Sequence, residues 1–328
     1  MDVLILGGTQ WLGRRLAQEA IARGHRVTAL ARGEAGPIAD GAVLVRADRS
    51  QPGAYDEVAR HEWGAVIDVT RQPGFARRAV AELGAHAAHW TFISSGNVYA
   101  VQNEPGTDES AALMAPLEAD ESTPETYGEA KSAIELAYRE ALGDRLLVIR
   151  PGLIAGPGDA SGRGGYWVAR AARDDEPMLV PDILATPVQA IHIDDLVRFA
   201  LDSVEQRVTG AFNAVGDRVT FGDWLEASRE VGGHRGEVVA VSPDWLESQG
   251  VAEWSGPEPL PLWIIDPEWN AFQNRSNVAA VAAGLRLRPL EQLLAEVLQW
   301  ERGEGLDRER GAGLSAARER ELLAALPG

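Results

Sequence analysis

The stretch VLILGGTQWLG, residues 3–13, joins an apolar run to an amphipathic segment through a glycine-rich turn. Four apolar residues in a row, Val3–Leu6, are typical of a strand buried on both faces of a sheet. The following segment, Trp11–Arg23, carries apolar residues at helical spacing. The stretch therefore predicts a buried strand, a tight turn and a helix.

The same alternation of short apolar runs and helical segments continues to about residue 215. Further strands are predicted at Arg26–Leu30, Ala42–Val45, Ala65–Asp68, Trp90–Ser94, Leu146–Arg150 and Ala211–Ala214. Helices are predicted near Tyr55–His61, around Phe75–Ala87, and over Glu125–Leu142 and Asp194–Ser203. Strands and helices in alternation predict an α/β fold with a doubly wound parallel sheet.

The composition excludes several classes of function. The chain has 328 residues, 49 acidic and 31 basic, and its net charge of −18 argues against nucleic-acid and anionic membrane partners. It has no cysteine, which excludes disulfides and thiol catalysis. His86 and His89 have no third ligand nearby, so no metal site is expected. No secretory signal or membrane-spanning run is recognised, and a cytoplasmic location is expected.

The glycine-rich turn has a chemical use. Gly7, Gly8 and Gly13 lie between a strand and a helix, where small residues let the backbone approach a pyrophosphate at a helix N-terminus. The turn predicts a dinucleotide-binding site. Because Gln10 stands where a strict G-x-G-x-x-G motif has glycine, a glycine turn in another kind of α/β protein stays open as the alternative.

The end of the second strand bears on which dinucleotide is bound. NAD-binding folds usually have an acidic residue there, which hydrogen-bonds the ribose 2′-hydroxyl. This chain has Arg32 instead, and a guanidinium suits a 2′-phosphate. NADP(H) is therefore preferred over NAD(H), with a solvated surface arginine as the alternative.

The stretch YGEAK, residues 127–131, contains the only lysine of the chain; all other basic residues are arginine. A lysine four residues after a tyrosine lies on the same helix face. Its ammonium can stabilise the phenolate of Tyr127, which otherwise has a pKa near 10. The pair therefore predicts acid–base chemistry, and an ordinary surface pair is the alternative.

These segments together resemble the extended and atypical branch of the short-chain dehydrogenase/reductases, the epimerase/dehydratase-like superfamily. The resemblance rests on GGTQWLG (7–13), ISSGNVY (93–99), YGEAK (127–131) and RPGLIAGPGD (150–159), with IHIDDLVRFAL and GAFNAVG in the second half. It covers roughly residues 1–215. It implies a Rossmann fold, a smaller C-terminal substrate lobe and an NAD(P)-dependent oxidoreductase.

The resemblance and the chemistry together imply roles for individual residues. Tyr127 is expected to be the acid or base, Lys131 to adjust its pKa and bind the nicotinamide ribose, and Ser95 to hold the substrate oxygen. The expected cofactor-binding residues are Gly7, Thr9, Gln10, Trp11, Leu12, Gly13, Arg32, Asp48, Arg49, Val69, Thr70, Ser94, Tyr127, Lys131, Pro151, Leu153 and Ile154.

The expected domain organisation follows from the same pattern. Residues 1–155, completed by about 188–215, are predicted to form the dinucleotide-binding domain. Residues 156–187 and 216–300 are predicted to form the substrate lobe, and 301–328 a charged helical tail. Residues 102–124 are acidic and rich in breaks, which predicts a surface insertion or a lid.

Departures from the family pattern indicate the reaction. Dehydratases have an Asp-Glu pair where this chain has Gly96 and Asn97, and many epimerases have an asparagine where the chain has Arg150-Pro151-Gly152. The sequence therefore predicts an NADPH-dependent reductase of a carbonyl or imine on a small molecule. A sugar-nucleotide epimerase and a non-enzymatic nucleotide-sensing or RNA-associated protein are the alternatives. The resemblance also admits a homodimer.

Overall fold

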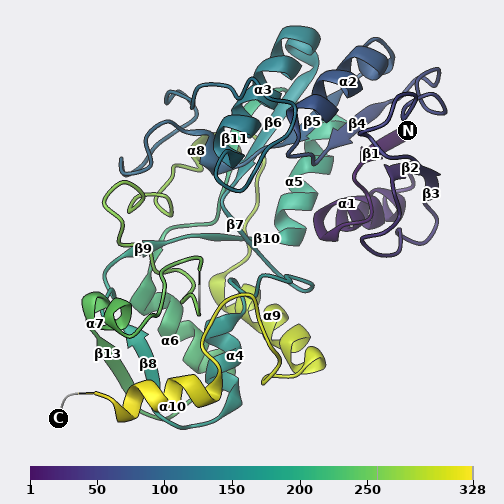
Figure 1. The fold of residues 1–328 in the computed structure, drawn as a ribbon. Helices are drawn as coiled ribbons and strands as arrows, with labels where there is room; N and C mark the ends of the chain where they lie inside the picture. The colour runs from purple at the N-terminus through teal and green to yellow at the C-terminus, as the bar shows by residue number, and fades with distance from the viewer. Residues whose placement is uncertain (257, 327–328) are drawn as a thin grey trace. The chain divides into compact units, whose positions relative to one another are not determined.

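The computed structural model describes residues 1–256 and 258–326. The chain divides into two compact units, shown in Figure 1. Unit 1 comprises Met1–Gly152, Ile193–Val215 and Arg275–Arg286, and unit 2 comprises Leu153–His192, Gly216–Asn274 and the residues from Leu287 onward. Unit 1 thus includes a segment near residue 280 that the sequence analysis assigned to the substrate lobe.

Unit 1 is built on a seven-stranded parallel sheet with the order β11-β6-β5-β4-β1-β2-β3. The order reverses beside β1, which pairs with β2 on one side and with β4 on the other. Ligands of such sheets bind at the carboxyl ends of the strands beside this reversal. The strands are β1 (Asp2–Leu6), β2 (Arg26–Ala31), β3 (Val43–Arg46), β4 (Ala65–Asp68), β5 (Trp90–Ile93), β6 (Leu146–Pro151) and β11 (Gly210–Ala214).

Helices cover both faces of this sheet. In Figure 1, α2 and α3 lie together on one face, and α1 and α5 lie together on the other. The helices of unit 1 are α1 (Trp11–Ala22), α2 (Pro73–Leu83), α3 (Tyr127–Leu142), α5 (Ile193–Gln206) and α8 (Val278–Ala282). Because both faces are covered, the middle strands are apolar without alternation: Val3–Leu6 has no exposed surface. This arrangement confirms the predicted doubly wound α/β fold.

Unit 2 combines helices with three two-stranded sheets. The strand pairs are β7 (Leu153–Ala155) with β10 (Ala190–His192), β8 (Met178–Pro181) with β13 (Val238–Val241), and β9 (Pro187–Val188) with β12 (Val219–Thr220). The helices are α4 (Tyr166–Arg173), α6 (Phe221–Gly232), α7 (Pro243–Ser248), α9 (Leu290–Glu304) and α10 (Ala316–Ala324). Trp167, Trp224 and Trp263 are almost fully buried in its core.

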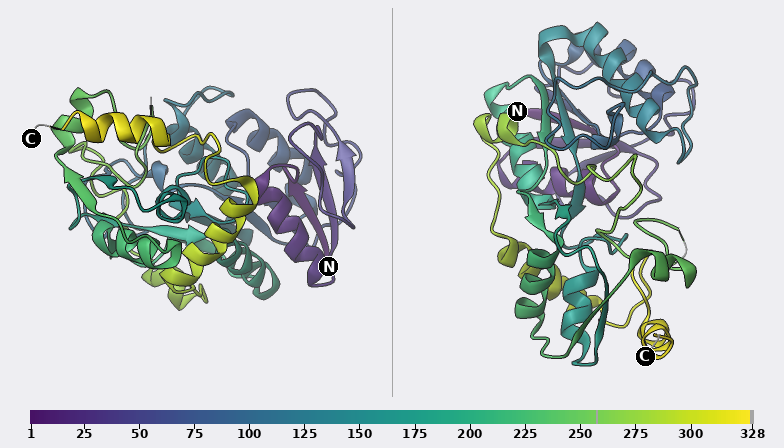
Figure 2. Two further views of the ribbon diagram at one scale, coloured as in Figure 1. Left: turned by 90° about the horizontal axis from the view of Figure 1, so that it is seen from below. Right: turned by 90° about the vertical axis from the view of Figure 1, so that its left-hand side faces the viewer.

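The C-terminal segment is part of unit 2 rather than an appendage. Helix α10, yellow in Figure 2, runs beside β8, and the backbone amide of Leu179 donates to Glu319 at 3.0 Å. Leu314 and Leu322 lie in the hydrophobic core of unit 2. Among the described residues, no helix combines the length and apolar character that a membrane crossing requires.

The predicted helix near Tyr55–His61 is a run of turns in the structure. The segment is short and lies between Gly53 and Gly64. Too few hydrogen bonds form in such a length to offset helix nucleation. A tertiary contact holds it instead, since the hydroxyl of Tyr55 donates to the carbonyl of Phe75 at 3.1 Å.

Candidate active site

The turn between β1 and α1 brings backbone segments too close for a larger residue. A Cβ atom on Gly13 would lie 2.2 Å from the carbonyl oxygen of Gly7. A Cβ atom on Gly7, whose φ is +103°, would lie 2.8 Å from Cγ2 of Val69. The N-cap residue Gln10 makes no side-chain cap, and the first turn of α1 has no acidic residue. The start of α1 therefore suits an anion such as a dinucleotide pyrophosphate.

The other predicted residues of this turn differ in exposure. Thr9 is buried, Trp11 and Leu12 are half-buried, and Gln10 is exposed. The turn lies at the carboxyl end of β1, beside the reversal of strand order. This is the position at which a doubly wound sheet receives a dinucleotide.

Two arginines lie where β2 and β3 end. Arg32 directly follows β2, and Arg46, the last residue of β3, is paired in register with Ala31. Nη1 of Arg46 donates to the carbonyl oxygen of Arg32 at 3.3 Å. The side chain of Arg32 is 62% exposed, and its ion pair with Glu34 (Nε to Oε2, 3.3 Å) is also exposed and therefore weak. Both guanidinium groups are accessible to an anionic ligand.

Asp48 and Arg49 follow β3. The side chain of Asp48 accepts a hydrogen bond within its own turn, whereas that of Arg49 points into the core. Asp48 Oδ1 accepts from the amide of Ser50 at 2.9 Å, and this bond, with the charge of Arg32 as a smaller cause, lowers the pKa of Asp48. Arg49 is buried, and its Nη1 and Nη2 donate to the two oxygens of Asp68 at 2.9 and 2.7 Å. Burial opposes its charge, yet Asp68 holds the pKa of Arg49 above the ordinary value. The Arg49 guanidinium is thus engaged in the core, which leaves its backbone as the candidate cofactor contact.

Ser95 follows β5 and begins a short 3₁₀ turn. Its Oγ accepts from the backbone amide of Asn97 at 3.2 Å and donates to Oδ1 of the same residue at 2.8 Å. Ser95 also lies close enough to Tyr127 to act on the pKa of the phenol. The hydroxyl is therefore oriented by Asn97 and placed beside the tyrosine.

Tyr127 and Lys131 lie one turn apart at the start of α3. Nζ of Lys131 is 5.8 Å from the centre of the Tyr127 ring. Burial raises the pKa of Tyr127, while the nearby Ser95 hydroxyl and the charge of Arg71 act in the opposite direction. The structure thus brings Ser95, Tyr127 and Lys131 together, with the phenol in its neutral form.

Lys131 itself is held by two backbone carbonyls. Its Nζ donates to Thr70 O at 2.7 Å and to Ile93 O at 2.8 Å, and the residue is 3% exposed. Burial lowers the pKa of Lys131 to about 7, although the charges of Asp68 and Glu135 raise it. Two of the three ammonium hydrogens are therefore occupied, and one remains for a further acceptor.

Ser94 is turned into the core beneath the site. Its hydroxyl donates to Oε1 of Glu135 at 2.6 Å. Arg150 binds the same carboxylate, with Nε to Oε1 at 3.0 Å and Nη2 to Oε2 at 2.6 Å. The Ser94 hydroxyl is thus used within unit 1, where it supports the helix that carries Lys131.

The predicted residues after the sixth strand fall in both units. Pro151 ends β6 in unit 1, whereas Leu153 and Ile154 lie on β7 in unit 2. They pair in register with Ala190 and Ile191 of β10.

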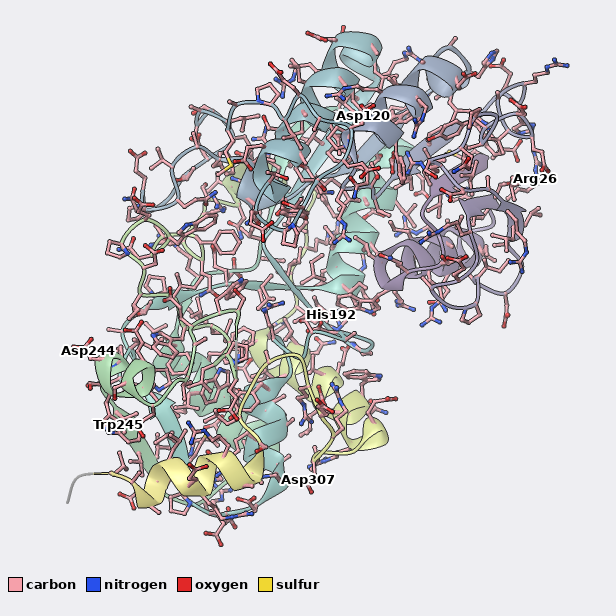
Figure 3. All side chains as sticks on the ribbon, viewed as in Figure 1. Arg26, Asp120, His192, Asp244, Trp245 and Asp307 are labelled. Atoms are coloured by element: carbon pink, nitrogen blue, oxygen red, sulfur yellow. The ribbon has the colours of Figure 1, made fainter. Side chains whose placement is uncertain are left out.

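The 102–124 insertion is attached to unit 1 by backbone hydrogen bonds. Met114 N donates to Val98 O at 2.7 Å, and Leu117 N donates to Glu129 O at 3.0 Å. Asp120, labelled in Figure 3, binds Arg77 of α2 at 2.6 Å. These contacts hold the insertion as a fixed part of unit 1 beside the start of α3.

Several residues of the site were not identified from the sequence. Asn97 orients Ser95, Arg71 acts electrostatically on Tyr127 and Lys131, and Glu135 lies one turn beyond Lys131 on α3. A signal existed for Glu135, because its spacing from Lys131 repeats the spacing of Lys131 from Tyr127. The sequence carried no such signal for Arg71, since it is one exposed arginine among many.

Comparisons with known proteins identify the relatives of this chain and its fold. No protein-family model matches the chain. Among curated proteins, a 3-diazoavenalumate denitrifying reductase from a Streptomyces species is 30% identical over 238 residues, which span 66% of this chain and 76% of the relative.

Solved structures of similar fold include two epimerases. The UDP-Glc/GlcNAc 4-epimerase of Campylobacter jejuni has a TM-score of 0.65 and 16% identity, covering 92% of this chain and 99% of that chain. The UDP-glucuronic acid 4-epimerase of Bacillus cereus, in complex with NAD, has a TM-score of 0.65 and 14% identity, covering 94% and 100%. At these identities the two structures establish the fold alone.

Proposed function

Since this chain belongs to the extended short-chain dehydrogenase/reductase superfamily, a class of NAD(P)-dependent enzymes, we propose that it is an NADPH-dependent reductase of a small-molecule carbonyl or imine. The observation that carries the proposal is the convergence of Ser95, Tyr127 and Lys131, with Tyr127 as a neutral phenol. A neutral phenol is the form that a proton donor needs.

The residues present suit a nicotinamide dinucleotide. The close approach at Gly7 and Gly13 leaves room for a pyrophosphate, and the remaining hydrogen of Lys131 Nζ is available to the nicotinamide ribose. When bound, the reduced cofactor supplies the hydride that reduces the substrate carbon.

The side chains of the chain carry out the proton chemistry. With substrate bound, the Ser95 hydroxyl turns its hydrogen from Oδ1 of Asn97 to the substrate oxygen. Tyr127 transfers its proton to that oxygen as negative charge develops there. Lys131, as an ammonium ion, stabilises the phenolate that results. The carbonyl thus gains one hydride at carbon and one proton at oxygen and becomes an alcohol.

The preference for NADPH rests on the ends of β2 and β3. Arg32 and Arg46 present two guanidinium groups there, and no carboxylate ends β2. Guanidinium groups recognise phosphate by charge-assisted hydrogen bonds. The epimerase from Bacillus cereus binds NAD, so cofactor choice is a point on which this chain is proposed to differ.

A second candidate substrate class comes from the curated relative. By its name, that enzyme reduces a diazo compound with loss of nitrogen. The same hydride donor and the same Tyr127 proton would convert a neutral diazo carbon to a CH₂ group with release of N₂. Both candidates consume NADPH, whereas a sugar-nucleotide epimerase would retain its cofactor and consume none.

The test is NADPH oxidation by the purified protein against a panel of carbonyl, imine and diazo compounds. Tyr127→Phe should lower the rate about 10²- to 10⁴-fold and change the Kd for NADPH far less, because it removes the proton donor and keeps the aromatic ring. Interconversion of a UDP-sugar epimer pair without NADPH consumption would refute the reductase proposal.

A further inference from the structure

Asp68, the last residue of β4, is a buried carboxylate with every strong acceptor position in use. Its Oδ1 accepts from Nη1 of Arg49 at 2.9 Å and from the amide of Thr70 at 2.8 Å. Its Oδ2 accepts from Nη2 of Arg49 at 2.7 Å and from the hydroxyl of Tyr138 at 2.5 Å. The residue has no exposed surface, so four donors hold it in one position.

Thr70 connects this carboxylate to Lys131. The amide of Thr70 donates to Asp68, and the carbonyl of the same residue accepts from Lys131 Nζ at 2.7 Å. The orientation of that carbonyl, and with it the position of the amine, depends on the hydrogen bond that Asp68 makes. The bond also keeps the short link between β4 and α2 from relaxing around Thr70.

We propose that Asp68 is the positioning residue of Lys131: it fixes the Thr70 backbone that receives the amine, and its buried negative charge keeps that amine an ammonium ion. The catalytic importance of this ion rests on the proposed function. The arrangement itself is a property of the folded chain and can be tested without a substrate.

The charged groups that face Lys131 define what Asp68 contributes. They are Asp68 from β4, Glu135 and Tyr127 from α3, and Arg71 from the link after β4. Burial lowers the pKa of Lys131 to about 7, and the charge of Asp68 is the largest cause acting in the opposite direction. Glu135 acts in the same sense and is the smaller cause; each carboxylate is also bound by an arginine, Asp68 by Arg49 and Glu135 by Arg150. Loss of the Asp68 charge should therefore leave Lys131 neutral at neutral pH.

The experiment exploits the composition of the chain. Because Lys131 is the only lysine, protein grown with [¹³Cε]lysine gives one side-chain NMR signal, whose shift reports the protonation of that residue. In the wild-type protein the signal should titrate with a midpoint near 7. In Asp68→Asn the midpoint should fall by about one unit or more, as expected when a close opposite charge is removed.

Tyr138→Phe is the matched control, because it removes one hydrogen bond to Asp68 and keeps the charge; its midpoint should match the wild type. Asp68→Asn leaves the buried Arg49 without its carboxylate partner, and this variant could fail to fold. In that case the double variant Arg49→Met, Asp68→Asn is measured in place of the single variant. An unchanged midpoint in whichever variant folds would overturn the proposal. If the Lys131 midpoints behave as expected but the protein oxidises NADPH with none of the carbonyl, imine or diazo compounds, the result would count against the proposed function and not against the role of Asp68.

Discussion

Lys131 combines a positive charge with nearly complete burial. Such a group is costly unless it is hydrogen-bonded and faced by opposite charge. Two backbone carbonyls supply the hydrogen bonds and two carboxylates supply the opposite charge. The pKa of Lys131 still lies far below its ordinary value of 10.5. A buried lysine can release its proton whereas an arginine stays charged, which gives a physical reason for a single lysine among arginines.

This burial predicts a pH dependence of stability. Below about pH 7 the amine is charged in both the folded and unfolded states, and the full cost of burying it is present. Between about 7 and 10.5 the folded state releases the proton and the unfolded state keeps it, so stability rises with pH. Relative to Lys131→Met, the wild-type free energy of unfolding should increase across this window by up to about 1.4 kcal/mol per pH unit. Urea unfolding at several pH values measures it, and a constant difference would contradict the prediction.

Arg32 carries the cofactor prediction. Arg32→Met should raise the Kd for NADPH about 10- to 100-fold, because a charge-assisted hydrogen bond to the 2′-phosphate is worth about 1.5–3 kcal/mol. The Kd for NADH should not change. Arg26→Met is the control, since Arg26 starts the same strand and lies at the outer edge of unit 1 (Figure 3). Calorimetric titration of the wild type and both variants with NADPH and with NADH gives all six Kd values. Tighter binding of NADH by the wild type would argue against NADPH.

At the scale of elements, the turn between β1 and α1 determines how strand, helix and cofactor meet. The turn could be predicted from its glycines because a missing side chain has a local consequence. The partners that require those glycines lie farther along the chain or across the turn, at Val69, Ala29 and the Gly7 carbonyl.

Gly13→Ala tests this turn. The added methyl group would lie 2.2 Å from Gly7 O, a backbone atom that cannot move without disturbing the turn. We expect a loss of about 1–3 kcal/mol in stability, together with weaker NADPH binding. Gly303→Ala in α9 is the control, because a methyl group there meets nothing within 4 Å. Equal thermal stability of the two variants would contradict the prediction.

At the scale of the whole molecule, buried ion pairs organise unit 2. Glu319 of α10 is 1% exposed and binds Nε of Arg170 at 2.5 Å and Nη2 of Arg173 at 2.7 Å. Glu301 of α9 is equally buried and binds Arg308 and Arg310 at 2.9 and 2.7 Å. Two acidic residues of a segment that composition alone assigns to solvent are therefore buried and paired with arginines.

Glu319→Ala should destabilise the protein by about 3–5 kcal/mol, because it removes the buried carboxylate partner of Arg170 and leaves that arginine only the partly exposed Asp174 as an acidic partner. Glu321→Ala removes an exposed carboxylate of the same helix and should change stability by less than about 0.5 kcal/mol. Thermal unfolding of the two variants gives the comparison. Equal melting temperatures would mean that α10 contributes little to unit 2.

The sequence by itself determined the α/β class and all seven strands of the parallel sheet. It also predicts the Ser95, Tyr127 and Lys131 set. The strands and the Tyr127–Lys131 pair depend on local spacing, through apolar runs, helical periodicity and residues one turn apart, whereas Ser95 depends on the resemblance to the family. Only the tertiary structure decided that Arg49 and Ser94 point into the core, that residues 55–61 form turns, and that Glu301 and Glu319 of the charged C-terminal segment are buried. The physical reason is that a polar side chain can be solvated or paired inside, and its partner lies far away in sequence, as Asp68 does for Arg49 and Arg170 does for Glu319.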